Sequence, residues 1–239
     1  MSGHSKWSSI KHKKGANDAK RGQVFTKMAN LIAAAARAGG SDPDANVRLR
    51  MAIDTAKKSN LPKDNIERAI KRGTGELEGA VIEEFIMEGF GPGGTGLIIE
   101  VISDNKNRSL AEIRNIMSKN GGIVADKGSV THLFEQKGII RGPLKEMTDS
   151  VEEIIIESGA EDYSLAERVL TVETARADLK SVKDILEKNK IKISEVDLEY
   201  VAQTEMEIDT TTEEKLLALL QTLDDNDDVA NVSTNAKDI

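Results

Sequence analysis

The chain has 239 residues, a formal net charge of −8 and no cysteine. This length allows two or three ordinary domains, and the lack of cysteine excludes disulfides, thiolate zinc sites and cysteine nucleophiles. No apolar run approaches the roughly 18 residues that cross a bilayer, and the N-terminus lacks the apolar region of a secretory signal. We therefore expect a soluble, cytoplasmic protein with no membrane partner.

The net charge is an average over two unlike regions. Residues 1–80 contain 16 Lys and Arg against 8 Asp and Glu, a net charge of +8. Residues 81–239 contain 17 against 33, a net charge of −16. Such an asymmetry indicates that one end meets a polyanion while the remainder keeps the molecule soluble. A solvated helical surface with a chance bias is the alternative.

The first 80 residues are predicted to form a basic arm and a helical bundle. An apolar stripe that ends at Gly39-Gly40 predicts the first helix; it consists of Val24, Met28, Leu31, Ile32 and Ala35. A second helix is expected after Ser41 and Asp42, with Pro43 in its first turn, and a third over 62–72, stopped by Gly73. The arm, residues 1–16, has no apolar period, and we expect a partner to order it.

After residue 80 the pattern changes to strands and helices in alternation. Strands are predicted at 82–88, 97–102 and 129–135, with a helix over about 107–119. A second cycle follows, with strands at Ile139-Ile140, 169–174 and 196–200 and helices from Asp149 and over 178–189. The last helix, near Thr212, and a strand at 229–233 cannot bury a core alone, so they must complete an earlier unit.

These elements predict an α+β fold of three domains. An N-terminal helical bundle, residues 1–80, precedes two α/β domains of the split βαβ, ferredoxin-like kind. The first α/β domain is discontinuous, 81–136 plus 204–239, and the second, 137–203, is inserted in it.

Motifs for catalysis or cofactor binding are weak. Residues 89–94 satisfy G-x-G-x-x-G, but the loop leads into a strand and contains Pro92, so a hairpin loop is the better interpretation than a dinucleotide site. Close approach of its backbone to phosphate or ribosomal RNA stays open, with Gly91, Gly93 and Gly94 as secondary contacts. His4, His12 and His132 have no metal spacing.

The acidic clusters at 205–214 and 224–228 are most simply a solvated face, with a magnesium site in a metal-dependent enzyme as the alternative. No Ser-His-Asp signature is present. We therefore predict no catalytic residue, no metal and no cofactor, and hence a protein that is not an enzyme.

The basic arm and the cations that follow it carry the strongest functional signal. The predicted primary phosphate contacts are Lys6, Lys11, Lys13, Lys14, Lys20, Arg21 and Lys27, against Asp18 alone in residues 1–27. Trp7, the sole tryptophan, has polar neighbours and could stack on a base. The predicted secondary contacts are Arg48, Arg50, Arg68, Lys71 and Arg72, followed by Lys106 and Arg108.

Eight segments in chain order carry a resemblance to a known family: GHSKW (3–7), KHKKGANDAKRGQVFTK (11–27), GGSDPDANVRLR (39–50), PKDNIERAIKRGTGE (62–76), EGFGPGG (88–94), DNKNRSLAEIRNIMSKNGG (104–122), GSVTHLFEQKG (128–138) and DVANVSTNA (228–236). At these segments the chain resembles the YebC/PmpR family. Phe90 and the pair Thr131-His132 depart from the Tyr and Ala-Tyr common in similar proteins. The resemblance implies the three domains described above.

The same resemblance implies a DNA-binding transcriptional regulator. It leaves open a ribosome-associated translation factor that contacts ribosomal RNA and relieves stalling at difficult, for example proline-rich, sequences. The predicted partners are thus DNA and/or ribosomal RNA, with the protein a monomer or a weak homo-oligomer.

Overall fold

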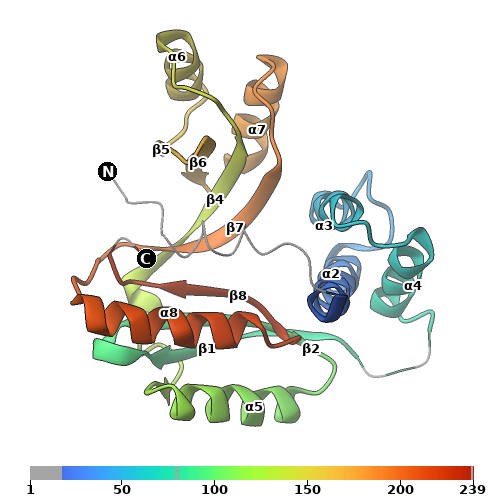
Figure 1. Cartoon of the computed structure of the whole chain (residues 1–239). Coiled ribbons are helices and arrows are strands. Elements are labelled where there is room, and N and C mark those ends of the chain that lie inside the picture. The colour runs from blue at the N-terminus through green and yellow to red at the C-terminus, as the bar shows by residue number, and fades with distance from the viewer. Residues whose placement is uncertain (1–17, 78, 80, 238) are drawn as a thin grey trace. The chain divides into compact units, whose positions relative to one another are not determined.

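The computed structural model describes residues 18–77, 79, 81–237 and 239, with side chains from Gly22 onward. In this part of the chain, seven α-helices and two four-stranded sheets form two compact units (Figure 1). One unit contains the described residues up to Thr131 together with Ile208–Val232, and the other contains His132–Glu207 and Ser233–Ile239. The predicted α+β class is confirmed.

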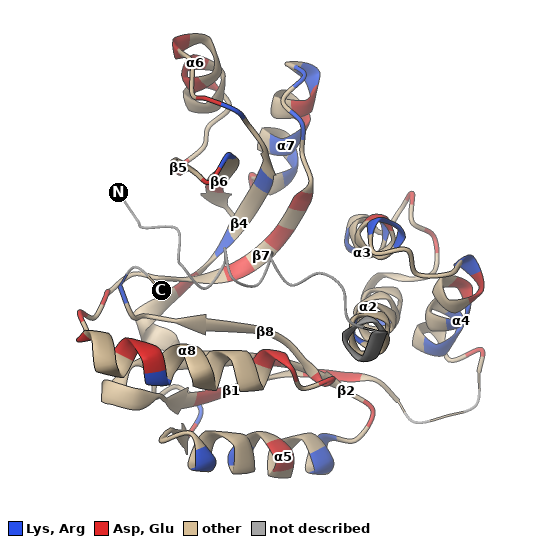
Figure 2. Cartoon of the chain, in the orientation of Figure 1, with Lys and Arg blue, Asp and Glu red and all other residues tan. Residues whose placement is uncertain are grey.

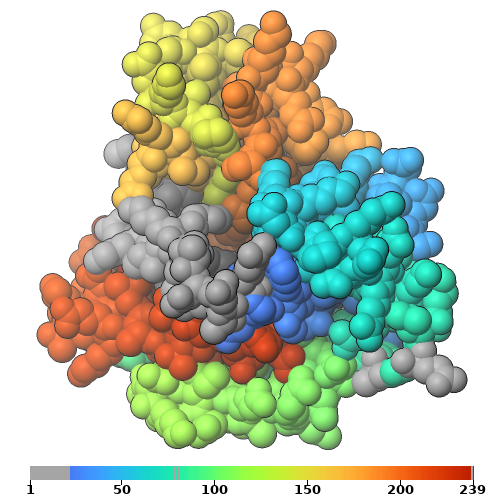
Figure 3. All heavy atoms as spheres, turned by 45° about the vertical axis from the view of Figure 1, so that its right-hand side comes forward, coloured from blue at the N-terminus to red at the C-terminus, as the bar shows by residue number. Residues whose placement is uncertain are grey.

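Three helices form the N-terminal bundle: α2 (Asp18–Gly39), α3 (Val47–Lys58) and α4 (Lys63–Thr74). Ile32, Leu49 and Ile66 belong to its core, with Phe25 and Met28 packed at the margin. The space-filling view shows α3 and α4 in contact with each other and with α2 (Figure 3). A second apolar cluster joins Ala33 and Ala34 of α2 to Ile82 and Ile102, so the alanine run of α2 is buried on two sides.

Two predicted helix boundaries are wrong. The second helix begins at Val47 rather than after Asp42, because Asn46 caps it: the Asn46 Oδ1 accepts from the Leu49 amide at 3.0 Å. The third helix continues through Gly73 to Thr74, and Gly75, which has φ +79°, caps its end. The close packing of α2 on α4 requires a glycine at position 73, because a Cβ there would be 2.2 Å from the carbonyl oxygen of Ala33.

The first sheet has the strand order β3-β1-β2-β8. Its strands are β1 (Glu83–Phe90), β2 (Gly96–Ser103), β3 (Ile123–Ala125) and β8 (Val229–Thr234), with the turn η1 (Pro92–Gly94) between β1 and β2. Strand β1 is antiparallel to both β2 and β3, and therefore β2, α5 (Lys106–Lys119) and β3 make a split βαβ unit around β1. Helix α8 (Thr210–Asp224) contacts both η1 and α5.

The strand predicted at 129–135 is wrong over most of its length. The chain there forms a turn and the short helix η2 (Thr131–Leu133), which contains His132, and a strand starts only at Phe134. The buried Glu88 carboxylate explains the difference, because it accepts the amides of Gly128, Val130 and Thr131 at 2.7, 2.7 and 2.8 Å. Those amides are consequently unavailable to a strand partner.

The second sheet has the order β5-β6-β4-β7 and the chain order of a ferredoxin-like βαββαβ domain. Its elements are β4 (Phe134–Pro143), α6 (Asp149–Glu157), β5 (Asp162–Ala166), β6 (Val169–Ala175), α7 (Leu179–Lys188) and β7 (Glu195–Ala202). The sequence analysis missed β5 and β3 and made β4 too short. Apolar residues of α6 and α7 pack on Ile140 and Val172, on one face of the sheet.

The domain boundaries stay a prediction, but β4 crosses one of them. Phe134 pairs with Ala202 in the same ladder in which Arg141 pairs with Glu195. Residues 134–136, assigned from sequence to the first α/β domain, are thus hydrogen-bonded into the sheet of the second, because the strand is continuous.

Candidate nucleic-acid interface

The arm residues Lys6, Trp7, Lys11, Lys13 and Lys14 lie outside the described residues. Lys20 and Arg21 belong to α2, but their side chains are not described. The structure therefore places the remaining predicted contacts, beginning with Lys27.

Four of the predicted contacts are held in internal ion pairs. Lys27 lies against Asp224, with Nζ 3.4 Å from Oδ1 and side chains only 14% and 16% exposed. Arg72 reaches Asp104 at 2.8 Å and Asn30 at 3.3 Å. Both pairs join the bundle to the first α/β domain, so these two cations have a structural role.

Arg48 and Arg108 are also paired. The Arg48 guanidinium makes two hydrogen bonds to the Glu84 carboxylate at the start of β1. Arg108 donates to Asp228 at 2.8 Å and lies 3.2 Å from Asp104; the Asp228 hydrogen bond is the largest cause that raises the Arg108 pKa. Ser103 and Ser109 also donate to the Asp228 carboxylate, at 3.1 and 2.7 Å.

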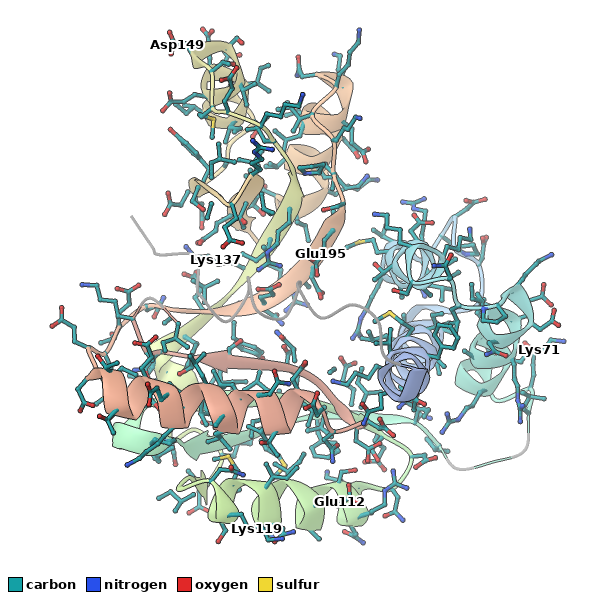
Figure 4. The ribbon with its side chains drawn as sticks, in the orientation of Figure 1. Lys71, Glu112, Lys119, Lys137, Asp149 and Glu195 are labelled. Carbon is teal, nitrogen blue, oxygen red and sulfur yellow. The ribbon has the colours of Figure 1, made fainter. Side chains whose placement is uncertain are left out.

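Three predicted contacts remain available. Arg50, Arg68 and Lys71 are exposed and pair with no carboxylate in the described part of the chain. Glu67, which precedes Lys71 by one turn of α4, lies 3.5 Å from Lys63. Lys71 points away from the packed side of α4 (Figure 4), and Figure 2 shows further basic residues on α3 and α4.

Arg68 and Arg72 are both predicted contacts, and the structure separates their roles. They lie one turn apart on α4, but Arg72 reaches Asp104 whereas Arg68 stays exposed. Proximity along the helix therefore did not determine which arginine is available.

The structure also exposes cations that the sequence analysis did not name as contacts, and three of them lie in the same unit as the bundle. Arg37 lies in the last turn of α2, and Arg114 and Lys119 lie on α5. All three are exposed and pair with no carboxylate among the described residues. A basic residue in the last turn of a helix was the available signal for Arg37 and Lys119, because cations favour that end of the helix dipole.

The secondary contacts have mixed environments. The Lys106 ammonium lies 5.1 Å from the centroid of the Phe85 ring, a cation–π contact within its own domain. A Cβ at Gly91 would be 2.8 Å from Thr95 Oγ1, and one at Gly93 would be 2.6 Å from Thr212 Cγ2, so these glycines let the loop pack against its own domain. Gly94 is exposed, with φ +81° and open space around it.

The acidic segment 224–228 is not simply a solvated face. Asp224 pairs with Lys27, the carbonyl of Asp225 accepts from Gln23 at 3.1 Å, and Asp228 is buried. No group of three or more His, Asp or Glu side chains within the described ranges is arranged to hold a metal ion. None of the described helices is long and apolar enough to cross a membrane.

Two family models together match most of the chain. The TACO1/YebC protein N-terminal domain matches residues 5–76, and the TACO1/YebC second and third domain matches 82–236. The chain belongs to the TACO1/YebC family. The resemblance found in the sequence is thereby confirmed.

Relatives of this TACO1/YebC chain are similar over their whole length. A "Probable transcriptional regulatory protein" of Desulfatibacillum aliphaticivorans is 51% identical over 237 residues, which cover 99% of this chain and 96% of that protein. A protein of the same name from Persephonella marina is 50% identical, with 98% and 95% covered. The crystal structure of the conserved hypothetical protein Aq1575 from Aquifex aeolicus is 43% identical, with a TM-score of 0.88 and 95% of each chain covered.

Proposed function

We propose that this TACO1/YebC chain is a non-enzymatic, nucleic-acid-binding regulator of gene expression, and that it acts in the cytoplasm as a DNA-binding transcriptional regulator. The observation that carries the proposal is the set of exposed cations on the bundle, Arg50, Arg68 and Lys71, which no internal carboxylate neutralises among the described residues. Together with the arm they offer charges to a phosphate backbone.

The connection between α3 and α4 supports DNA as the ligand. The two helices are separated by residues 59–62, a four-residue turn of the length found in helix-turn-helix units. Helix α4 is the second helix of this pair and carries both Arg68 and Lys71. In such units the second helix lies in the major groove, where phosphate contacts fix its position.

Removal of the α4 cations is expected to weaken DNA binding mainly through electrostatics. The double variant Arg68→Ala, Lys71→Ala should lower the magnitude of the slope of log K against log salt by about two. Without these two cations the protein neutralises two phosphates fewer, so binding releases about two counterions fewer from the DNA. The slope is measured by fluorescence anisotropy of labelled duplex DNA at several salt concentrations. The matched control is Lys180→Ala, Lys188→Ala, which removes two exposed lysines from α7. Equal slopes for the two double variants would contradict a role for α4.

Removal of the arm lysines is expected to have a larger effect. Lys11→Ala, Lys13→Ala, Lys14→Ala should weaken binding and lower the salt slope by about three if all three side chains contact phosphates. The same titration measures it, and an unchanged slope would remove these lysines from the interface.

A second candidate is a ribosome-associated translation factor. The exposed backbone of Gly94, at the end of η1, favours it, because no described residue other than its chain neighbours lies within 4 Å of a Cβ built there and an RNA phosphate could approach closely. Crosslinking the protein to nucleic acid in cells and sequencing the product separates the two candidates. A transcriptional regulator should be crosslinked to promoter DNA, whereas a translation factor should be crosslinked to ribosomal RNA.

A further inference from the structure

The second sheet has one apolar face and one charged face. Ile140, Val172 and Val196 lie on the face that α6 and α7 cover (Figure 1). Because side chains alternate along a strand, the neighbouring positions project from the opposite face. We use the name acidic face for the polar and charged positions of that side, together with the central Ile139: Glu135, Lys137, Ile139, Arg141, Asp162, Ser164, Thr171, Glu173, Glu195, Asp197 and Glu199. The same side also carries the apolar positions Pro143, Ala166, Val169, Ala175 and Val201 near the strand ends.

Carboxylates outnumber cations on the acidic face. It has six carboxylates and two cations, and β7 contributes three of the carboxylates at alternate positions (Figure 2). Both cations are already paired: Arg141 with Glu199, and Lys137 with Glu173 at 3.5 Å and with the neighbouring Glu161 at 3.3 Å. Lys137 and Glu195 are labelled on β4 and β7 in Figure 4. The formal charges of the residues that make up the acidic face therefore sum to −4.

Several residues of the acidic face are buried although both helices lie on the other side of the sheet. Ile139 is 2% exposed, Thr171 4% and Glu173 3%. The buried Arg141 Nε and Ser164 Oγ have no hydrogen-bond partner among the described residues. Arg141 Nε needs an acceptor, which a simple cation does not offer and a peptide carbonyl does. A basic peptide satisfies both the charge and this donor.

We propose that the acidic face binds the basic arm of this same chain, residues 1–16. The arm contains four lysines and no carboxylate, so its charge complements the face, whereas a nucleic acid would be repelled. Sixteen residues extend to roughly 53 Å, several times the width of about 15 Å across four strands. If the proposed function holds, the acidic face and nucleic acid compete for the arm.

Trp7 makes this contact measurable, because it is the sole tryptophan and belongs to the arm. Acrylamide quenching of Trp7 is measured in the full-length protein without nucleic acid, from about 0.01 M salt, where the Debye length is about 30 Å, to about 1 M, where it is about 3 Å. We expect the quenching constant to rise at least about twofold as salt releases the arm. A quenching constant that does not change with salt would overturn the proposal.

Two double variants locate the contact. Glu135→Gln, Asp197→Asn removes two charges from exposed residues of the acidic face and spares Glu195 and Glu199, the two carboxylates that form ion pairs with Arg141. At low salt it should show the high quenching constant that the unmodified protein shows at high salt. Glu153→Gln, Glu157→Gln removes two exposed carboxylates from α6 and should behave like the unmodified protein. Equal behaviour of the two variants would place the arm elsewhere.

Two further readouts separate the remaining outcomes. Quenching that depends on protein concentration would mean that the arm binds a second copy, and it would overturn the intramolecular contact. DNA affinity tests the competition: Glu135→Gln, Asp197→Asn should bind more tightly than the α6 variant. The Trp7 measurement does not involve DNA, so loss of the DNA effect alone would count against the proposed function and leave the contact standing.

Discussion

Replacement of Gly73 by alanine is expected to destabilise the helical bundle by about 2 kcal/mol. Alanine gains about 1 kcal/mol of helix propensity over glycine, but the added Cβ would lie 2.2 Å from the Ala33 carbonyl oxygen. Because that neighbour is backbone, no side-chain rotation relieves the clash, and α4 must move away from α2. Overpacking typically costs about 1–3 kcal/mol, and a clash with backbone belongs at the upper end of that range. Urea unfolding followed by far-ultraviolet circular dichroism measures the change.

The matched control is Gly22→Ala on α2. Gly22 is exposed within the helix, and a Cβ there would meet nothing within 4 Å. This substitution should therefore stabilise the protein by about 0.5–1 kcal/mol. The opposite signs of the two stability changes test the close approach of α4 to α2 at Gly73. Stabilisation by both substitutions would show that the two helices do not approach so closely in solution.

The substitution Glu88→Gln is expected to cost about 3 kcal/mol at neutral pH. Burial by itself raises the Glu88 pKa, but hydrogen bonds from Gly128, Val130 and Thr131 outweigh it and lower the pKa from 4.5 to about 2. Each unit of pKa corresponds to about 1.4 kcal/mol, which gives the expected size. Glutamine also turns an NH₂ group toward one of the three amide donors, which leaves that amide without an acceptor.

The effect of Glu88 depends on pH in a defined direction. A lowered carboxyl pKa stabilises the folded state fully above pH 4.5, and this contribution disappears as the pH falls from 4.5 to about 2. The difference in the free energy of unfolding between the unmodified protein and Glu88→Gln should therefore shrink as the pH falls over that range. Glu83→Gln, on an exposed residue of the same strand, is the control and should have little effect. Amide exchange at Gly128 and Val130 should accelerate in Glu88→Gln alone.

The helices and their order were predictable because their periodicity is local. The stripe through Leu31 and Ile32 correctly predicted α2 and its end. The stripe could not show that Ala33 and Ala34 are buried as well, since their partners, Ile82 and Ile102, lie far along the chain. Likewise, Val24 belongs to the stripe but is 36% exposed.

The errors have a common physical cause. Gly73 was predicted to end a helix because glycine often does so, but the approach of Ala33 explains its presence inside α4. The strand predicted around Val130 has β-forming residues, but the buried Glu88 carboxylate binds its amides. In both cases a partner distant in sequence overrides a local preference.

The sequence by itself determined the family, the α+β class and the concentration of positive charge in the first 80 residues, because composition and local periodicity carry that information. Only the tertiary structure decided which cations are available. Lys27 and Arg72 are paired with Asp224 and Asp104, whereas Arg68 remains exposed. Ion pairs form between side chains that folding brings within a few ångströms, and Lys27 and Asp224 lie 197 positions apart.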